Sequence, residues 1–313
     1  MAPIPLLILN PLDPERVARI AAGGFAPQLA VGPAARAAAI AALPQTRAVL
    51  TNGATGFTAA EMAALPRLEI ICAIGVGHEN IDVAAARARG ITVTHGPGTN
   101  AASVADHAMA LLLGLLRGIP QADAAVKRGE WMGARGPRPS VSGKRLGILG
   151  LGEIGLLIAQ RAEAGFAMPI AYHNRRPREG CAYPWMASAA ELAAWADVLM
   201  IAAPGGAATR HLVDAAALEA LGPAGFLVNI GRGSVVDQPA LIQALREGRI
   251  AGAALDVVDG EPVVPAEMLD LPNLIITPHI AGRSPEAVLA TATLVVANLR
   301  AHFAGQPVLT PVA

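Results

Sequence analysis

Three residues with side chains suited to the reduction of a ketone each follow a short apolar run that predicts a β-strand. They are Arg232, Glu261 and His279, after the predicted strands Phe226–Ile230, Ala251–Leu255 and Leu274–Ile276. A ketone that accepts a hydride needs a proton donor at its oxygen, and histidine titrates in the right range to serve. A neighbouring carboxylate favours imidazolium and orients the ring. A guanidinium can hold a substrate carboxylate and polarise the adjacent carbonyl.

Each of these residues also has a purely structural interpretation. Arg232 would form a salt bridge beside a phosphate, Glu261 would belong to the turn Asp259–Pro262, and His279 would be a capped histidine of the core. Ligands of open α/β sheets bind beyond the carboxyl ends of the strands. The joint occurrence of the three residues at such ends therefore favours the chemical interpretation.

The segment Arg145–Gly155, RLGILGLGEIG, places three glycines in the G-x-G-x-x-G spacing of a dinucleotide-binding turn. It predicts a buried strand, Leu146–Leu149, that leads directly into a helix. Gly150 would turn the chain sharply, Gly152 would let backbone N–H groups reach a pyrophosphate, and Gly155 would let the helix pack on the strand. A glycine-rich loop without a ligand is the alternative interpretation.

The residues after the next strand indicate which nucleotide binds. The helix Ile154–Phe166 and the strand Ile170–His173 complete a βαβ unit, after which an NAD-binding unit normally carries an acidic residue for the ribose hydroxyls. This chain has Asn174, Arg175 and Arg176 there. A guanidinium binds a 2′-phosphate through a charge-assisted fork, whereas a carboxylate would repel it. The sequence therefore predicts NADP(H) in preference to NAD(H), with a solvated arginine loop as the alternative.

Strand and helix signals alternate along the first third of the chain, which predicts a parallel sheet. The expected strands are Ile4–Leu9, Ala48–Thr51, Glu69–Ile74 and Ile91–Thr94, and the expected helices are Asp13–Ala22, Pro33–Leu43, Thr58–Leu65 and Val83–Arg89. Gly75 and Gly77 flank Val76 in the loop after the third of these strands. Consecutive N–H groups there would form a nest for a small carboxylate, or the segment would be an ordinary tight turn.

A Gly/Pro cluster at His95–Asn100 marks a domain boundary. The predicted organisation is one domain of residues 1–98 and 285–313 and a second of residues 99–284. In the second domain, Ala101–Leu116 predicts a long buried helix. The segment Gln121–Ser142, a helix and an irregular stretch, contains Trp131 and Met132 and is either an arm that packs on a partner subunit or a surface loop.

The βα alternation resumes after the glycine-rich unit. A strand Val198–Ile201 ends in Ala202-Ala203-Pro204, and the three strands that precede Arg232, Glu261 and His279 follow it. The final segment, Pro285–Ala313, predicts one long helix with a stop at Gly305-Gln306-Pro307, and we expect it to return to the first domain.

Composition narrows the class of protein. The 313 residues are enough for two domains with separate cores, and the balance of 24 basic and 24 acidic residues favours neither nucleic acid nor an acidic membrane as a partner. The apolar run Ala108–Leu116 is too short to span a bilayer, and Met1–Pro11 is typical of a first strand, not of a signal peptide. Cys72 and Cys181 cannot build a disulfide framework, so we expect a cytoplasmic protein in which Cys72 is a core residue.

Four motifs in order and spacing resemble the D-isomer-specific 2-hydroxyacid dehydrogenase family over nearly the whole chain. The motifs are Gly150–Gly155, Asn229–Asp237, Leu255–Val257 leading to Glu261-Pro262, and Thr277–Gly282. The chain is most similar to the branch of glyoxylate/hydroxypyruvate reductases and relatives acting on 2-ketogluconate or hydroxyphenylpyruvate, where an arginine after the second strand commonly accompanies NADPH.

The resemblance implies an α/β fold of two Rossmann-like or flavodoxin-like doubly wound parallel-sheet domains, a cleft between them and a homodimer built through the cofactor domain. It implies that Arg232 binds a small 2-oxo acid, that His279 donates the proton and that Glu261 pairs with His279. The N–H groups of Val76 and Gly77 would hold the substrate carboxylate. Hydride would pass from C4 of the nicotinamide to C2 of the substrate, giving a D-hydroxy acid, and no metal is expected.

The same resemblance implies a set of cofactor contacts. Asp256 would lie near the carboxamide, and Pro204 and Thr209 would lie along the adenosine. The full set is Gly150, Leu151, Gly152, Glu153, Ile154, Gly155, Asn174, Arg175, Arg176, Ala203, Pro204, Thr209, Ile230, Arg232, Asp256, His279 and Gly282.

The chain departs from the family pattern at three positions. Ala101 stands where many relatives have a threonine near the cofactor, and Glu79 stands where aspartate is common. Arg283 stands where small residues are frequent, and it would reach a polyhydroxy or second anionic group of the substrate. The first departure weakens any expectation of a side-chain contact there.

Two other enzymes on the same scaffold resemble this chain, but the residues at their characteristic positions disfavour both. Formate dehydrogenase has glutamine in the place of Glu261, and phosphite dehydrogenase has a lysine in the substrate loop, where Ala73, Ile74 and Val76 stand here. A nucleotide-sensing corepressor-like binding protein without turnover remains the alternative from a different class. This chain lacks the long flanking tails expected of it, and turnover of any 2-oxo acid would separate the two.

Overall fold

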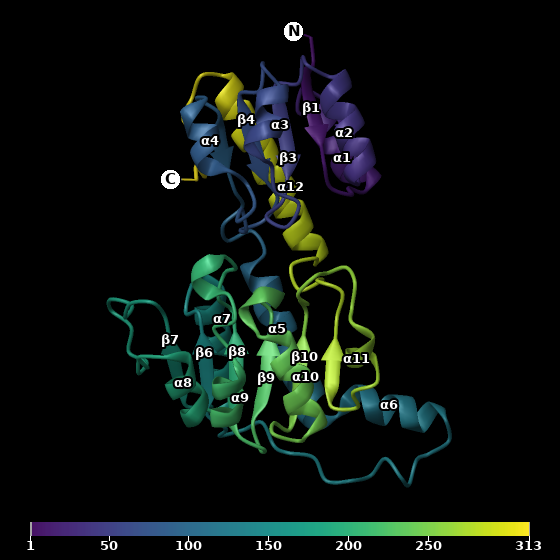
Figure 1. The fold of residues 1–313 in the computed structure, drawn as a ribbon, viewed down its shortest axis with the longest axis vertical. Helices are drawn as coiled ribbons and strands as arrows, with labels where there is room; N and C mark the ends of the chain where they lie inside the picture. The colour runs from purple at the N-terminus through teal and green to yellow at the C-terminus, as the bar shows by residue number, and fades with distance from the viewer. Residues whose placement is uncertain (1, 313) are drawn as a thin grey trace. The chain divides into compact units, whose positions relative to one another are not determined.

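The computed structural model describes residues 2–312, which form two compact units (Figure 1). One unit runs up to Asn100 and takes up the chain again from Arg283, and the other is Ala101–Gly282. Each unit holds one parallel sheet with helices on both faces. The prediction of an α/β fold with two doubly wound parallel sheets is confirmed.

The first unit contains a five-stranded sheet in the order β2-β1-β3-β4-β5, in which every pair of neighbours is parallel. The strands are β1 (Ile4–Ile8), β2 (Phe25–Leu29), β3 (Ala48–Thr51), β4 (Ile70–Ala73) and β5 (Thr92–Thr94). The helices are α1 (Pro14–Ala22), α2 (Pro33–Ala42), α3 (Ala59–Ala64), α4 (Val83–Ala88) and α12 (Pro285–Phe303). Thr58 caps α3 in a capping box with Glu61, as its position before the helix predicts.

Alternate side chains of these strands pack on opposite faces of the sheet. Leu7, Val49 and Ile71 share a core with α2, α3 and α4. Leu50 and Cys72 share the other core with α1 and α12. Burial raises the pKa of the Cys72 thiol to about 12, which makes it an unreactive core residue as expected.

The ends of this sheet differ from the expected elements in one strand and one terminal pairing. Strand β2 was not predicted, because its sequence FAPQL carries a proline and alternates poorly; proline is tolerated there because β2 is an edge strand. The final helix ends at the predicted stop, since α12 ends at Phe303 and Gly305 takes a φ of +69°. The chain then pairs Pro311 with Thr94 beside β5. Ala313, the last residue of the predicted segment, and Met1 lie outside the described residues.

The second unit contains a six-stranded parallel sheet in the order β11-β10-β9-β8-β6-β7. The strands are β6 (Leu146–Leu149), β7 (Ile170–His173), β8 (Val198–Ile201), β9 (Phe226–Asn229), β10 (Gly252–Leu255) and β11 (Leu274–Ile276). The α-helices are α5 (Ala101–Arg117), α6 (Ile119–Lys127), α7 (Glu153–Phe166), α8 (Ala189–Trp195), α9 (Ala215–Leu221), α10 (Gln238–Arg246) and α11 (Ala266–Leu269). Two 3-10 turns, Ala207–Thr209 and Gly233–Val235, complete it.

The order of the strands shows at which strands of this sheet a ligand is expected to bind. From β6 the chain passes to β7 on one side and then returns to β8 on the other side. Doubly wound sheets bind ligands at the carboxyl ends of strands at such a reversal. Alternating side chains again form two cores, one with α5 and α7 and the other with α8, α9 and α10.

The segment after α6 is an extended stretch without strands or helices up to β6 (Figure 1). Trp131 is 63% exposed and Met132 is 73% exposed in this stretch. No single helix among residues 2–312 is long and apolar enough to cross a bilayer; α5 and α6 pass such a test only as a pair, bent by 61°.

Candidate active site

His279 and Glu261 form a close pair at the carboxyl end of the second sheet. The Nδ1 atom of His279 lies 2.6 Å from Oε1 of Glu261, and the side chains are 42% and 33% exposed. Burial opposes the charge of Glu261, but the hydrogen bond and charge of His279, the Val258 N–H and the charge of Arg232 together lower the pKa of this carboxyl. The carboxylate is therefore ionised at neutral pH.

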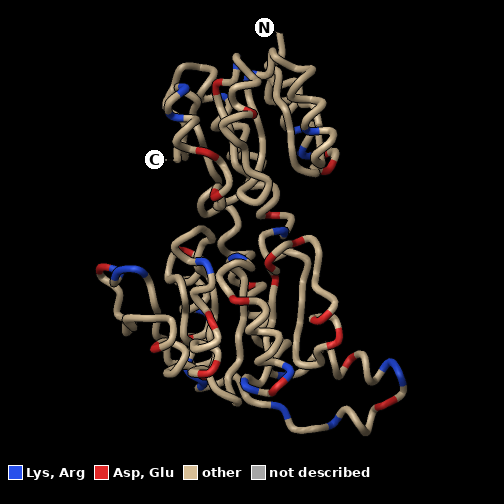
Figure 2. Tube along the Cα trace, in the orientation of Figure 1, with Lys and Arg blue, Asp and Glu red and all other residues tan. Residues whose placement is uncertain are grey.

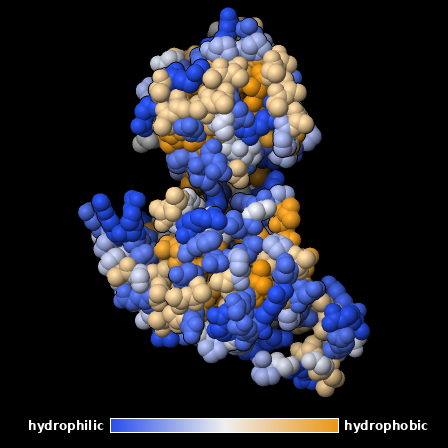
Figure 3. Space-filling view, in the orientation of Figure 1, coloured by the Kyte–Doolittle hydropathy of each residue, from blue (hydrophilic) through white to orange (hydrophobic). Residues whose placement is uncertain are grey.

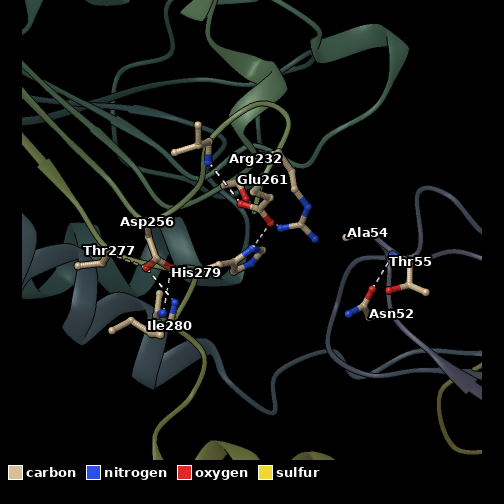
Figure 4. A network of polar contacts seen from close by, with 12 residues as sticks. Asn52, Ala54, Thr55, Arg232, Asp256, Glu261, Thr277, His279 and Ile280 are labelled. Carbon is tan, nitrogen blue, oxygen red and sulfur yellow. Dashed lines mark hydrogen bonds and ion pairs between the residues drawn. The ribbon is translucent and has the colours of Figure 1, made fainter. Parts of the chain in front are cut away.

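The backbone around His279 is held in an unusual conformation. His279 has a φ of +54°, which non-glycine residues rarely adopt, and its N–H donates to the Asp256 carbonyl at 2.9 Å. The Asp256 carboxylate is 1% exposed and accepts from the N–H groups of Ile280 and Ala281, each at 2.9 Å. It also accepts from the Thr277 hydroxyl at 2.7 Å (Figure 4). These bonds to Asp256 hold the backbone around His279 in its unusual conformation.

Arg232 is positioned by a buried amide at the end of β9, the strand that it follows. Asn229 ends β9; its Nδ2 donates to the Arg232 carbonyl at 3.0 Å, and its Oδ1 accepts from the Gly231 N–H at 3.0 Å. Nη1 of Arg232 donates to the Gly231 carbonyl at 2.8 Å. Figure 4 shows the guanidinium beside the Glu261 carboxylate and on the same side as the His279 ring. The structure thus brings the three predicted residues together.

The glycine-rich turn lies at the end of β6. Gly150 has a φ of +98°, and a Cβ there would lie 2.6 Å from the Ala203 nitrogen, so the turn after β6 passes directly against the end of β8. Gly152 caps α7 without any side-chain hydrogen bond, and a Cβ on it would meet nothing within 4 Å. The first N–H groups of α7, at Glu153, Ile154 and Gly155, have no partner within the helix and receive no side-chain cap from Gly152.

The loop after β7 carries the predicted arginines. Arg175 and Arg176 are exposed, and neither forms an ion pair with another of residues 2–312. Figure 2 shows their basic stretch on the loop that extends from β7, and Figure 3 shows hydrophilic side chains there. Asn174 is turned back to the glycine-rich turn, where its Oδ1 accepts from the Leu151 N–H at 2.7 Å. Asn174 thereby ties the arginine loop to that turn.

Val76 and Gly77 belong to the other unit, in the loop that follows β4. Gly75 opens this loop with a φ of +84°, and its carbonyl accepts from the Gly96 N–H at 2.6 Å. The loop closes at Ile81, whose N–H donates to the His78 carbonyl at 3.0 Å. The loop is therefore a turn whose backbone is held by hydrogen bonds at both ends.

The chain matches a known family model and close relatives. The model for the NAD binding domain of the D-isomer specific 2-hydroxyacid dehydrogenases matches residues 109–281. The hydroxyphenylpyruvate reductase of Plectranthus scutellarioides is 43% identical over 85% of this chain and 85% of its own length. The 2-ketogluconate reductase of Gluconobacter oxydans is 42% identical over 86% of this chain and 87% of its own length.

This chain belongs to the D-isomer specific 2-hydroxyacid dehydrogenase family. A solved structure of the NADPH-dependent glyoxylate/hydroxypyruvate reductase of Sinorhizobium meliloti, in complex with NADP and malonate, superposes with a TM-score of 0.92. It is 39% identical and covers 100% of this chain and 97% of its own. The resemblance to the glyoxylate/hydroxypyruvate reductase branch is therefore confirmed, as are the two Rossmann-like domains.

The second unit of this dehydrogenase fits a dinucleotide at the glycine-rich turn. The uncapped first turn of α7 offers N–H groups and the positive end of a helix dipole to a pyrophosphate. Of the remaining expected cofactor residues, Ala203 and Ile230 are buried, while Pro204 and Gly282 reach the surface. Thr209 donates to the Pro204 carbonyl at 2.7 Å, which fixes the loop after β8.

Two further residues of this unit contact the predicted site, although neither was predicted from the sequence. Arg178 donates from Nη1 to the Leu151 carbonyl at 3.1 Å and so contacts the glycine-rich turn. His107 on α5 lies 3.0 Å from the Thr277 hydroxyl, beneath Asp256. The run NRRPR was a signal for Arg178, whereas nothing local in the sequence pairs α5 with the end of β11. No group of three or more His, Cys, Asp or Glu residues between positions 2 and 312 could hold a metal ion.

Proposed function

We propose that this dehydrogenase uses NADPH to reduce a small 2-oxo acid, of the glyoxylate, hydroxypyruvate or 2-ketogluconate type, to the D-2-hydroxy acid. The observation that carries the proposal is the pair of His279 and Glu261, 2.6 Å apart, with the Arg232 guanidinium beside it. All three residues follow the carboxyl ends of strands in the sheet whose strand β6 leads into the glycine-rich turn. The named activities of the three relatives support the substrate class.

Arg232 would bind the substrate. Its guanidinium carries a permanent charge and a planar set of donors that suit a carboxylate and the neighbouring ketone oxygen. The N–H groups of Val76 and Gly77 would also donate to the substrate carboxylate. The charge of Arg232 would also draw electrons from the ketone, so that C2 becomes a better hydride acceptor.

His279 would supply the proton. The Glu261 carboxylate accepts a hydrogen bond from the Nδ1–H of the ring. Nε2 is therefore the ring nitrogen that remains for the substrate. When bound, the reduced nicotinamide supplies the hydride that becomes the new C–H bond at C2. The Nε2–H bond of His279 breaks as the ketone oxygen takes the proton, and the Glu261 carboxylate stabilises the imidazolium before this transfer. Solvent then returns a proton to Nε2.

Arg175 and Arg176 would select NADPH over NADH. They are exposed on the loop after β7, without carboxylate partners among the described residues. A 2′-phosphate would find two free guanidinium groups there and no repelling carboxylate. The NADP bound to the reductase of Sinorhizobium meliloti supports this preference.

The test is the steady-state oxidation of NADPH and of NADH with glyoxylate, hydroxypyruvate and 2-ketogluconate. In the variant Arg175→Ala, kcat/KM for NADPH should fall about 10- to 100-fold, since a charge-assisted hydrogen bond contributes about 1.5–3 kcal/mol. The value for NADH should not change. Arg67→Ala, which removes an exposed arginine of the other unit, is the matched control.

Two outcomes would contradict the proposal at different levels. Equal use of NADPH and NADH by the wild type would remove the cofactor preference and leave the reductase. Absence of turnover with any 2-oxo acid would remove the reductase, and the nucleotide-sensing interpretation would then take its place.

A further inference from the structure

Two histidine rings converge on one backbone carbonyl in the loop after β4. Nδ1 of His95 lies 3.1 Å from the Val76 oxygen, and Nδ1 of His78 lies 3.3 Å from the same oxygen. The rings meet edge to face, with centroids 5.3 Å apart and an interplanar angle of 79°. A carbonyl oxygen only accepts hydrogen bonds and has two lone pairs, so each Nδ1 carries a hydrogen and both can donate.

We propose that His78 and His95 are positioning residues that clamp the Val76–Gly77 peptide, so that its N–H is presented to the substrate carboxylate. This inference rests on the proposed function, because it needs a 2-oxo acid as the ligand of that N–H. It assigns no proton transfer to either ring. The two histidines act through the peptide alone.

The geometry of the peptide bond carries the argument. Among the described residues the only cis peptide is Glu261-Pro262, so the Val76–Gly77 peptide is trans. In a planar trans peptide the C=O and the following N–H point in opposite directions. Fixing the Val76 oxygen therefore fixes the direction of the Gly77 N–H. Within residues 2–312 that N–H donates to no other group, so it is available to a ligand.

The His95 side of the clamp is anchored in the core of the unit. The His95 N–H donates to the Thr310 carbonyl at 3.1 Å, and the Thr310 hydroxyl donates to the His95 carbonyl at 2.6 Å. Nδ2 of Asn298, a buried residue of α12, donates to that hydroxyl at 2.9 Å. The backbone of His95 is thus anchored through Thr310 to a buried amide outside the loop that it clamps.

The loop after β3 packs closely against the loop that contains Val76 and Gly77. A Cβ on Gly53 would lie 2.7 Å from the carbonyl carbon of Gly77, so the loop after β3 passes directly against the peptide that follows, Gly77–His78. The Asn80 N–H also donates to the Gly53 carbonyl at 3.3 Å. The loop after β3 therefore limits the movement of Gly77, while the two imidazole donors hold the Val76 carbonyl.

Alanine and asparagine variants at both histidines test the clamp. Asparagine places its amide donor close to the position of Nδ1, whereas alanine removes the donor. In His95→Ala and in the double variant with His78→Ala, the KM for glyoxylate should rise about five- to tenfold, as expected for a lost or misdirected hydrogen bond. The kcat and the KM for NADPH should stay near the wild-type values, because the contact is made equally in the ground and transition states.

The conservative variants and a control separate positioning from loss of structure. His95→Asn and His78→Asn should recover most of the lost affinity. His302→Ala, a half-buried histidine of α12, should leave the KM for glyoxylate unchanged. Inhibition by oxamate, which has the same carboxylate beside a carbonyl, should weaken in parallel with the KM. Hydrogen exchange of the peptide spanning residues 75–80 should quicken in the alanine variants alone.

The outcomes that would overturn the proposal are distinct from failure of the proposed function. Alanine variants with an unchanged KM for glyoxylate, or asparagine variants no better than alanine, would refute the clamp while the reductase stands. An alanine variant that no longer turns over but exchanges residues 75–80 as slowly as the wild type would refute it as well. A wild type without any 2-oxo acid turnover would remove both proposals together.

Discussion

Glu261 is placed to act on His279 in two ways, as an acceptor that orients the ring and as a charge that favours imidazolium. The distance of 2.6 Å between Nδ1 and Oε1 provides the first. The lowered pKa of Glu261 provides the second, because it keeps the carboxylate ionised at neutral pH. The two effects can be separated, since an amide oxygen accepts a hydrogen bond without carrying a charge.

The variant Glu261→Gln isolates the charge. We expect turnover of the substrate at saturation to slow by roughly 100-fold, the scale of a weakened general acid. The KM for NADPH should be unchanged, because the glycine-rich turn is not altered. Steady-state kinetics at neutral pH provide the measurement, and a turnover rate close to that of the wild type would show that orientation alone is sufficient.

The same pair makes a small contribution to stability with a defined pH dependence. The pKa of Glu261 is lower in the folded protein than in the unfolded chain, so the contribution is complete above the ordinary glutamate pKa and is lost as the pH falls through the lowered value. Both side chains are a third or more exposed, which limits it to less than about 1 kcal/mol. Urea unfolding of the wild type and of Glu261→Gln should therefore converge in acid. A gap that widened below pH 4.5 would contradict this sign.

At the scale of elements, the contact of α7 with β6 determines how closely the helix N-terminus approaches the glycine-rich turn. A Cβ at Gly155 would lie 2.4 Å from the Gly150 carbonyl oxygen and 3.2 Å from a methyl group of Ile148. Neither the turn nor the buried strand can move aside without cost. The helix and the strand are thus packed so closely that only a residue without a Cβ fits at position 155.

Two glycine-to-alanine substitutions in α7 should act in opposite directions. Gly155→Ala should destabilise the protein by about 1–3 kcal/mol through overpacking and should raise the KM for NADPH. Gly165→Ala, in the last turn of the same helix, meets nothing within 4 Å and should stabilise by about 0.4–1 kcal/mol with unchanged kinetics. Chemical unfolding and NADPH titration measure both. Equal effects at the two positions would show that helix propensity, and not contact, governs α7.

Buried strands were predictable from the sequence because their apolar runs are continuous, as in Val198–Ile201 and Ile70–Ala73. Strand β2 was not, because an edge strand needs few apolar residues. The end of α12 was predictable from the stop at Gly305. The pairing of Pro311 with Thr94 is a tertiary contact that no local pattern encodes.

The candidate site shows the same division between local and tertiary signals. Arg232, Glu261 and His279 were predictable because each follows a strand and each has a side chain with a chemical use. The residues that hold them in place were not. Asp256 anchors the His279 backbone through a bond that depends on how β10 and β11 pair. Asn229 anchors Arg232 through a local bond between residues three positions apart, which the strand pattern alone did not indicate.

At the scale of the whole molecule, the chain builds two units with separate cores and exposes two large apolar side chains in the segment after α6. Trp131 and Met132 of this segment are 63% and 73% exposed. Large apolar side chains exposed together are typical of interfaces, and tryptophan and methionine are enriched there. This supports the arm interpretation of the segment that contains them, with a second copy of this chain as its partner.

Replacing two side chains of the arm should separate the copies. We expect the wild type to have a solution mass of about twice 31.8 kDa by light scattering. The double variant Trp131→Ser with Met132→Ser should shift towards the monomer, because truncation of a central aromatic anchor typically costs an interface at least about 2 kcal/mol. Leu289→Ser removes an exposed leucine of the other unit and should leave the mass unchanged. A monomeric wild type, or a double variant that remains dimeric, would make the segment a surface loop.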